Sequence, residues 1–109
     1  MVAELVALAG PSARGAFMQH ELVGLAGLCP RGGREADLHI AVRAPWRGTG
    51  VGRGLLDELL SSEAREHFDV IRLRTDHKHR AALALGVSVG MEPTELGRGR
   101  VELRMVRHI

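Results

Sequence analysis

The chain has 109 residues, of which 45% are hydrophobic and 26% are charged. This size and balance are typical of one small folded domain and exclude an intrinsically disordered chain. No apolar run approaches the roughly 20 residues that a membrane-spanning helix needs. The first residues, MVAELVALAGP, lack the basic start of a secretory signal. We therefore expect one soluble domain over 1–109, located in the cytoplasm.

Charge and cysteine content exclude further classes of protein. The 15 Lys and Arg residues are nearly balanced by 13 Asp and Glu residues, so the net charge is +2 with His neutral. Only 3% of the residues are aromatic and the basic residues form no long run, so a nucleic-acid-binding surface is not expected. Cys29 is the one cysteine, which excludes an intrachain disulfide, and its place at the end of an apolar run predicts a packed thiol.

The first segments of the chain predict one helix and two strands. Residues 2–9 place apolar side chains at helical spacing, and a Gly-Pro pair ends this predicted helix. A short strand is expected at 15–19. The continuous apolar run at 22–29 predicts a buried strand, because both of its faces would be covered.

The next segment, 36–43, alternates between apolar and polar residues after a turn at 31–34. This alternation predicts a strand with two different faces. One face carries Leu38, Ile40 and Val42, and the other carries Asp37, His39 and Ala41. Pro45 ends the strand, because proline cannot donate a ladder hydrogen bond.

The second half predicts helix, strand, helix and strand. An apolar stripe predicts a helix at 51–67, and β-branched residues predict a strand at 69–75. A helix is expected at 79–85, with Asp76 as a candidate cap. Residues 100–107 alternate and predict the last strand. This order indicates a mixed α/β domain with one sheet.

A glycine-rich loop, 47–54 (RGTGVGRG), joins the strand at 36–43 to the helix that follows. Such a loop at a helix N-terminus is typical of phosphate binding, because backbone N–H groups and the helix dipole attract an anion. The loop lacks the Lys of a P-loop, and its glycine spacing does not match the Rossmann fingerprint. A strand–helix turn without a ligand is the alternative interpretation.

The loop resembles the acetyl-CoA-binding motif of the GNAT superfamily of N-acetyltransferases, V-x-P-x-x-[QR]-x-x-G-x-G/A. Arg47, Gly50 and Gly52 match this motif, and Pro45 precedes them one place later than usual. Similar segments elsewhere are 21–26, 70–75 and 79–91. The resemblance covers about 3–107 and implies a mixed sheet with a central glycine-loop helix.

The resemblance implies an acetyl-CoA-dependent N-acyltransferase in which a small-molecule or protein amine attacks the thioester directly. Pantetheine would lie along 36–43, where the sheet splays, and the pyrophosphate would rest on the glycine loop. The implied cofactor-binding residues are Ile40, Ala41, Val42, Arg47, Gly48, Thr49, Gly50, Val51, Gly52, Arg53 and His79.

The chain departs from the family at positions that handle protons. The family's Tyr acid aligns with Gly86, its cofactor-contacting Asn with His79, and the Glu base of some members with Arg74. Asp37 and His39 are the candidate catalytic residues instead, since they would share a strand face beside the thioester. A solvent-facing polar pair is the alternative interpretation for these two residues.

A further departure concerns the N-terminal part. Residues 2–9 resemble the end of the family's second helix, so the usual first strand and first helix are expected to be missing, with one wall of the acceptor pocket. We expect a homodimer that completes this wall, with 100–107 as the contact strand. An open site and a non-catalytic acyl-CoA-binding remnant are the alternatives. No metal site is expected, because the histidines near 77–79 lack a third ligand at usable spacing.

Overall fold

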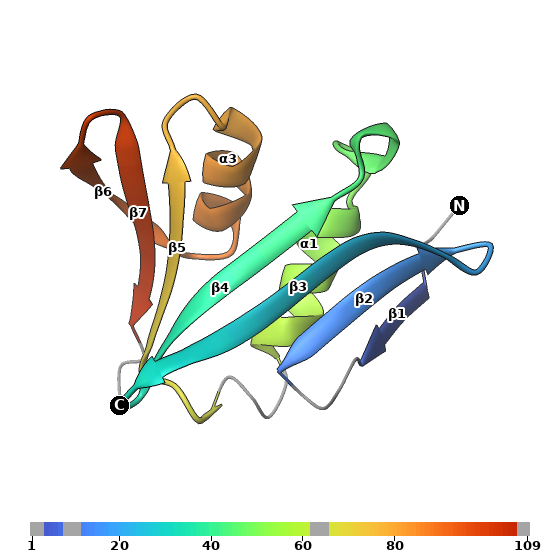
Figure 1. Cartoon of the computed structure of the whole chain (residues 1–109), viewed down its shortest axis with the longest axis horizontal. Helices are drawn as coiled ribbons and strands as arrows, with labels where there is room; N and C mark the ends of the chain where they lie inside the picture. The colour runs from blue at the N-terminus through green and yellow to red at the C-terminus, as the bar shows by residue number, and fades with distance from the viewer. Residues whose placement is uncertain (1–3, 8–11, 62–65, 107–109) are drawn as a thin grey trace.

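The computed structural model describes residues 4–7, 12–61 and 66–106 (Figure 1). Its strands are β1 (Glu4–Ala7), β2 (Ala13–Met18), β3 (Glu21–Gly32), β4 (Glu35–Val42), β5 (Val70–Asp76), β6 (Glu92–Gly97) and β7 (Arg100–Val106). Its helices are α1 (Val51–Leu60) and α3 (Arg80–Ser88), and a short 3-10 helix, η1 (Ala44–Trp46), precedes α1.

The strands form one sheet in the order β1-β2-β3-β4-β5-β7-β6. Neighbouring strands are antiparallel except β4 and β5, which are parallel because α1 lies on the connection between them. Figure 1 shows that β4 and β5 touch at one end and separate toward the other, where both helices begin. The mixed α/β class with one sheet is therefore confirmed.

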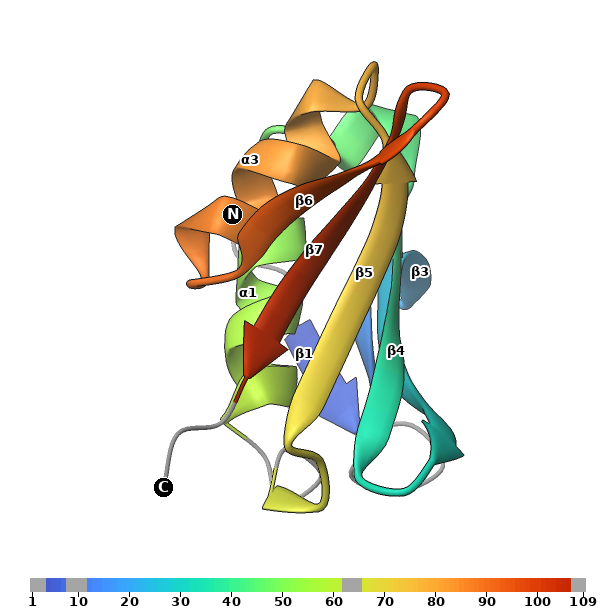
Figure 2. The same ribbon diagram turned by 90° about the vertical axis from the view of Figure 1, so that its left-hand side faces the viewer.

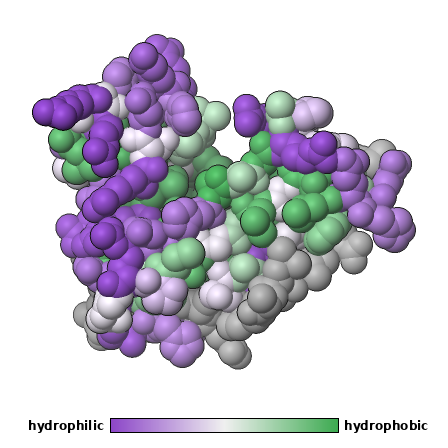
Figure 3. All heavy atoms as spheres, viewed as in Figure 1, coloured by the Kyte–Doolittle hydropathy of each residue, from purple (hydrophilic) through white to green (hydrophobic). Residues whose placement is uncertain are grey.

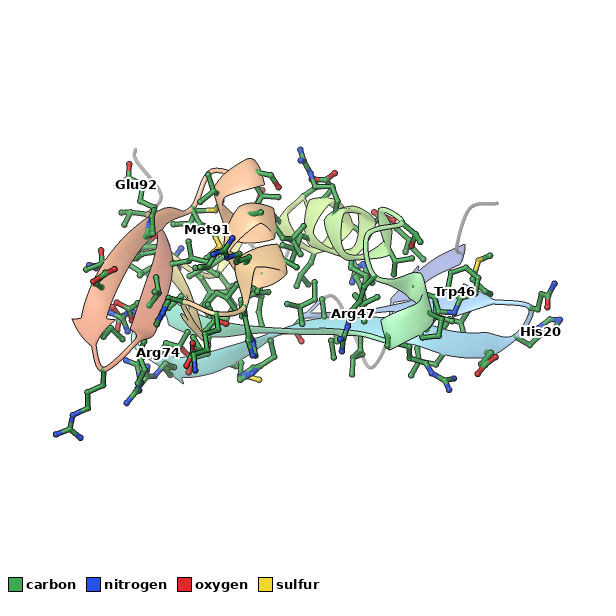
Figure 4. All side chains as sticks on the ribbon, turned by 90° about the horizontal axis from the view of Figure 1, so that it is seen from above. His20, Trp46, Arg47, Arg74, Met91 and Glu92 are labelled. Atoms are coloured by element: carbon green, nitrogen blue, oxygen red, sulfur yellow. The ribbon has the colours of Figure 1, made fainter. Side chains whose placement is uncertain are left out.

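Both helices cover the same face of the sheet, as the views in Figures 2 and 4 show. Helix α1 buries three fully covered leucines, Leu55, Leu56 and Leu59, against the strands. Each such side chain contributes about 1.5–3 kcal/mol relative to exposure. Gly24 on β3 lets α1 approach closely, since a β-carbon there would lie 2.9 Å from Leu55 and 3.0 Å from Val51.

The predicted helix at 2–9 is wrong where the structure describes it. Residues Glu4–Ala7 form β1, which pairs antiparallel with β2 and places Leu5 opposite Ala16. The strand satisfies its backbone through β2 while Leu5 packs on the core, and this tertiary gain overrides the local helical spacing. Five residues connect β1 to β2. The expected absence of the family's first strand and first helix stays a prediction.

The sequence analysis does not predict strand β6, whose presence makes β7 an internal strand of the sheet. All six residues of β6 are exposed, and they include Pro93 and Gly97, so the segment has neither alternation nor β-forming composition. Because β6 lies at the edge, β7 is enclosed between β5 and β6. The prediction that 100–107 offers a free edge to a second subunit is therefore wrong.

Two other local predictions need correction. Cys29 is exposed rather than packed, because it lies on the face of β3 that the helices leave open, opposite Asp37 of β4. Helix α1 ends at Leu60 rather than near 67, with Ser61 as its C-cap; residues 62–65 of the predicted helix lie outside the described residues.

Candidate functional site

The parallel strands β4 and β5 separate after three pairs of residues. They pair from Glu35 with Val70 to Asp37 with Arg72. Beyond this point β4 continues with β3 as far as Val42, and β5 continues with β7 as far as Asp76. Residues 38–42 thus have a strand partner on one side only, and their other edge borders a splay in the described sheet. The splay that the resemblance implies is present.

The glycine loop follows β4 at the open end of this splay (Figure 1). Gly48 and Gly50 have φ angles of 75° and 93°, which L-residues rarely adopt. Gly50 is the N-cap of α1 and supplies no side chain to cap it. The first helical hydrogen bond runs from the Gly54 N–H to the Gly50 carbonyl, at 3.0 Å. The N–H groups of the first turn, 51–53, therefore remain available to an anion.

The loop backbone faces open space at Gly48 and Gly50. A β-carbon added at Gly48 or Gly50 would meet no atom within 4 Å. The Thr49 hydroxyl donates to the Trp46 carbonyl, so its side chain closes the loop rather than reaching outward. This arrangement presents main-chain donors, and their position depends on backbone conformation rather than on side-chain identity.

The two arginines of the loop differ in their partners. Arg47 donates from Nε to the Val42 carbonyl at 3.1 Å, which ties the loop to the end of β4; Figure 4 shows its side chain beside this strand. Arg53 donates from Nε to both carboxylate oxygens of Asp57, at 3.1 and 3.2 Å. The charge of Arg53 is thus already balanced one helical turn away, whereas Arg47 is bound to a neutral carbonyl.

Gly52 brings α1 close to the strand and to the second helix. A β-carbon there would lie 3.1 Å from Leu85 of α3, 3.6 Å from Val42 and 3.7 Å from Ile40. The glycine at this position therefore serves close packing, and its N–H can still face a ligand. Ile40 and Val42 point toward the helices, as their alternation predicts, while Ala41 is exposed on the opposite face.

Asp37 and His39 lie on the face of the sheet that carries no helix. Asp37 is in the last residue pair before the splay, and Arg31 holds its carboxylate at 3.4 Å. His39 is exposed and lies two residues farther, opposite Gly27 of β3. The prediction that these two side chains share a face is confirmed; their catalytic role stays a prediction.

The junction between β5 and α3 lies across the splay from the loop. Asp76 accepts a hydrogen bond from the Lys78 N–H at 2.8 Å, and this bond is the main cause that lowers the pKa of the Asp76 carboxyl. Desolvation opposes this effect, whereas coulombic interactions with His77, Lys78 and His79 lower the pKa of Asp76 further. Asp76 does not cap α3: the N-cap is His79, which is exposed.

The positions that align with the family's acid and base have structural roles here. Gly86 is buried where α3 packs on β7, and a β-carbon there would lie 2.7 Å from Leu103. A tyrosine at this position would collide with the sheet. Arg74 lies on the open face and donates to Glu102 at 3.3 Å (Figure 4).

Glu102 of β7 is a polar residue for which the sequence analysis predicts no role. Its side chain is 15% exposed and lies between Arg72, at 3.6 Å, and Arg74. The alternation of residues 100–107 indicates which face of the sheet Glu102 occupies, but only the pairing of β5 with β7 identifies Arg72 and Arg74 as its partners.

Within the described ranges no group of three His, Cys, Asp or Glu residues is arranged to hold a metal ion. No described helix is long and apolar enough to cross a membrane.

A cavity of about 630 Å³ lies away from the splay, between α3 and the β6–β7 hairpin. Its lining is mainly apolar and also includes His77, Ser88 and Glu95. His77 is held there by the Gly99 carbonyl, 2.9 Å from its Nδ1. None of the residues predicted to bind the cofactor lines this cavity, so it is separate from the candidate site.

Comparison with known proteins identifies a family. The model of the Acetyltransferase (GNAT) family matches residues 6–90 of the chain. No curated protein matches the chain in sequence.

Solved structures show the same fold at low sequence identity. A ribosomal-protein-alanine N-acetyltransferase from Brucella melitensis is 27% identical with a TM-score of 0.74, over 87% of this chain and 68% of that one. The protein yncA from Salmonella typhimurium, solved with its cofactor acetyl-CoA, is 20% identical with a TM-score of 0.75, over 86% and 63%. The GNAT domain of S. lividans PAT gives 17% and 0.78, over 87% and 60%. The chain thus spans under two thirds of the length of two of these three.

Proposed function

Because the chain belongs to the GNAT acetyltransferase family, which uses acetyl-CoA, we propose that it transfers an acetyl group from acetyl-CoA to an amine. One observation carries the proposal: the unpaired edge of β4 leads directly into a glycine loop and an uncapped helix N-terminus. A site made of main-chain donors at a splay suits a ligand that has both amide groups and phosphates. A cytoplasmic location is part of this proposal.

The residues present fit acetyl-CoA in two places. The N–H groups of 51–53, together with the Arg47 guanidinium and the loop 48–50, would hold the pyrophosphate. The main chain of Ile40, Ala41 and Val42 would pair with the pantetheine amides, as one strand pairs with another. His79 lies on the opposite side of the splay and would border the ligand. Bound acetyl-CoA would supply an activated thioester.

Catalysis would rest mainly on orientation. The β4 edge and the start of α1 would hold the acyl group in place for the attacking amine, which would lower the entropic cost of the reaction. Asp37 and His39 face the open side of the sheet, from which the amine would approach, and are candidates to accept its proton. Gly86 supplies no acid, but a leaving thiol with a pKa of about 8.5 needs no such help near neutral pH.

The face of the sheet that carries no described helix also affects which acceptor amine could reach the site. No described helix covers the sheet beside Asp37 and His39, so a bulky amine, such as the end of a polypeptide, has access. The relative from Brucella melitensis acts, by its name, on an alanine of a ribosomal protein. We therefore favour a protein amine over a small molecule.

A non-catalytic acyl-CoA-binding module is the second candidate function. The observation that favours it is the loss of both family side chains that move protons: Gly86 is packed against Leu103, and Arg74 is paired with Glu102. This alternative predicts the same binding of acetyl-CoA without transfer.

The experiment that separates the two measures amine-dependent release of CoA. The protein is incubated with acetyl-CoA and a panel of small amines and peptide N-termini, and the acetylated product is detected by mass spectrometry. A thiol reagent alone would be misleading, because Cys29 is exposed and would react. Transfer to at least one amine supports the proposal. Binding without transfer to any amine would favour the module, and a lack of binding would refute both.

A further inference from the structure

The cavity between α3 and the β6–β7 hairpin plays no part in the proposed function. Its volume of about 630 Å³ lies within the range of small-molecule sites in proteins. It is formed on the face of the sheet that carries the helices, whereas the acceptor amine would approach from the other face (Figures 2 and 4). A ligand in this cavity would therefore occupy a site separate from those of acetyl-CoA and the acceptor.

The apolar part of the cavity lining leaves hydrophobic surface in contact with solvent. Val87 of α3 is 52% exposed, and Pro93 of β6 is exposed as well, while Val101 of β7 is buried. The opposite face of β5, β6 and β7 presents mainly hydrophilic side chains (Figure 3). A ligand with an apolar body would remove the surface of Val87 and Pro93 from water, which favours binding.

Glu95 gives the cavity a negative charge. In the part of the chain that the structure describes, its carboxylate has neither a hydrogen bond nor an ion pair. An ionised carboxylate only accepts hydrogen bonds. The complementary group on a ligand is therefore a donor, and a positively charged donor is the strongest.

The other two polar side chains of the lining, His77 and Ser88, also offer acceptors. The main-chain N–H and the ring Nδ1 of His77 both contact the Gly99 carbonyl, at 2.8 and 2.9 Å, which fixes the ring. Because a carbonyl only accepts, Nδ1 carries a proton, and Nε2 of the neutral ring is left as an acceptor. The Ser88 hydroxyl donates to the Leu85 carbonyl at 2.6 Å, so its oxygen can only accept from a ligand.

We propose that this cavity binds a small hydrophobic amine, with its protonated nitrogen near Glu95 and His77 and its apolar body against Val87. A protonated primary amine brings three donors and a positive charge, which match three acceptors and one carboxylate. A ligand that ends in a carboxylate would lack these donors and would be repelled by Glu95. An alcohol of the same shape would bring one donor and no charge.

Titration of the ¹⁵N-labelled protein with three ligands of similar size tests the proposal. The probes are 2-phenylethylamine, 2-phenylethanol and 3-phenylpropanoate, at about pH 7.5, where an imidazole is mostly neutral. The amine should shift the amides of α3 and β6 that line the cavity. Its dissociation constant should be about fivefold below that of the alcohol, because an exposed ion pair contributes up to about this factor. The anion should bind most weakly.

Two variants separate the charge from the apolar contact. Glu95→Gln keeps the shape of the side chain and removes its charge, so the preference for the amine over the alcohol should disappear. Glu92→Gln is the matched control, because Glu92 is also an exposed residue of β6 but does not line the cavity. Val87→Ser should weaken the amine and the alcohol alike, by about threefold. Circular dichroism should show that all these variants fold, since each position is exposed.

Three results would overturn the proposal: no shift in the cavity lining at about 10 mM amine, an anion that binds as tightly as the amine, or an unchanged preference for the amine in Glu95→Gln. Amine-induced shifts confined to 37–42 would report binding on the acceptor side and would overturn it as well. These titrations contain no acetyl-CoA. A failure of acetyl-CoA to bind would therefore refute the proposed function and leave the amine site unaffected.

Discussion

The two sides of the splay follow the family pattern to different degrees. On the α1 side, Gly48 and Gly50 adopt the backbone conformations that expose main-chain donors, and Arg47 is tied to β4. On the α3 side, the position of the family's tyrosine is a glycine packed against Leu103. Main-chain binding depends on the fold alone, whereas proton transfer depends on individual side chains. The comparison therefore predicts retained binding of acetyl-CoA with altered acid–base chemistry.

Introducing the family's tyrosine at position 86 should destabilise the packing of α3 on the sheet rather than restore a general acid. Gly86→Tyr should lower the free energy of unfolding by about 3 kcal/mol, because its β-carbon would already lie 2.7 Å from Leu103. Chemical denaturation measures this loss. Val87→Tyr, one residue farther on the exposed side of α3, should change stability little. A stable Gly86→Tyr variant with faster transfer would contradict our account of this position.

The candidate base is tested by His39→Ala. If transfer occurs, this change should lower kcat about 100-fold without changing the affinity for acetyl-CoA, since a general base acts on the amine alone. The control is His67→Ala, which removes another exposed histidine. Steady-state kinetics with one accepted amine provides both values. An unchanged kcat would make His39 an ordinary strand residue and would leave Asp37 as the candidate.

The α1 side is tested by a pair of glycines with similar positive φ angles. Gly50 and Gly97 have φ angles of 93° and 86°, and a β-carbon at either would meet nothing within 4 Å. Alanine at either position should cost about 1 kcal/mol of stability. Only Gly50→Ala should weaken acetyl-CoA binding, by about tenfold in calorimetry. Equal binding by both variants would show that the loop is only a connection.

The smallest expected effect concerns Asp76. The hydrogen bond from Lys78 lowers the pKa of its carboxyl, so the folded state favours the ionised form. This stabilisation is present above the unfolded pKa and disappears as the pH falls through the lowered folded pKa. Asp76→Ala should therefore lower Tm more at pH 7 than in acid, where the carboxyl is protonated in both states and only its neutral acceptor oxygen still binds the Lys78 N–H. Asp76→Asn keeps an acceptor oxygen and should lose less at pH 7. A loss of Tm in Asp76→Ala that is equally large at both pH values would contradict this cause.

The sequence predicts the parts of the fold that depend on local patterns. The alternation of 36–43 places Leu38 and His39 on opposite faces correctly, and the glycine spacing locates the start of α1. These signals are carried by neighbouring residues, so no long-range information is needed to interpret them.

Other features depend on residues far apart in the chain and could not be predicted in this way. Strand β1 forms because β2 offers an edge, against its own helical spacing. Strand β6 has no apolar alternation because both of its faces are exposed. The contact between Gly86 and Leu103 and the pairing of Glu102 with two arginines both require the register of β5 with β7. The loop and strand that form the candidate site could thus be predicted from the sequence, whereas the hydrogen-bond and ion-pair partners of its side chains could not.

The central claim is that the free edge of β4 and the start of α1 hold acetyl-CoA through main-chain groups. A titration of the ¹⁵N-labelled protein with acetyl-CoA, followed by amide chemical shifts, tests it most directly. We expect the largest shifts at 48–53 and along 38–42, with CoA reproducing those of the loop. Shifts confined to the cavity between α3 and β6, or none at millimolar acetyl-CoA, would contradict the account.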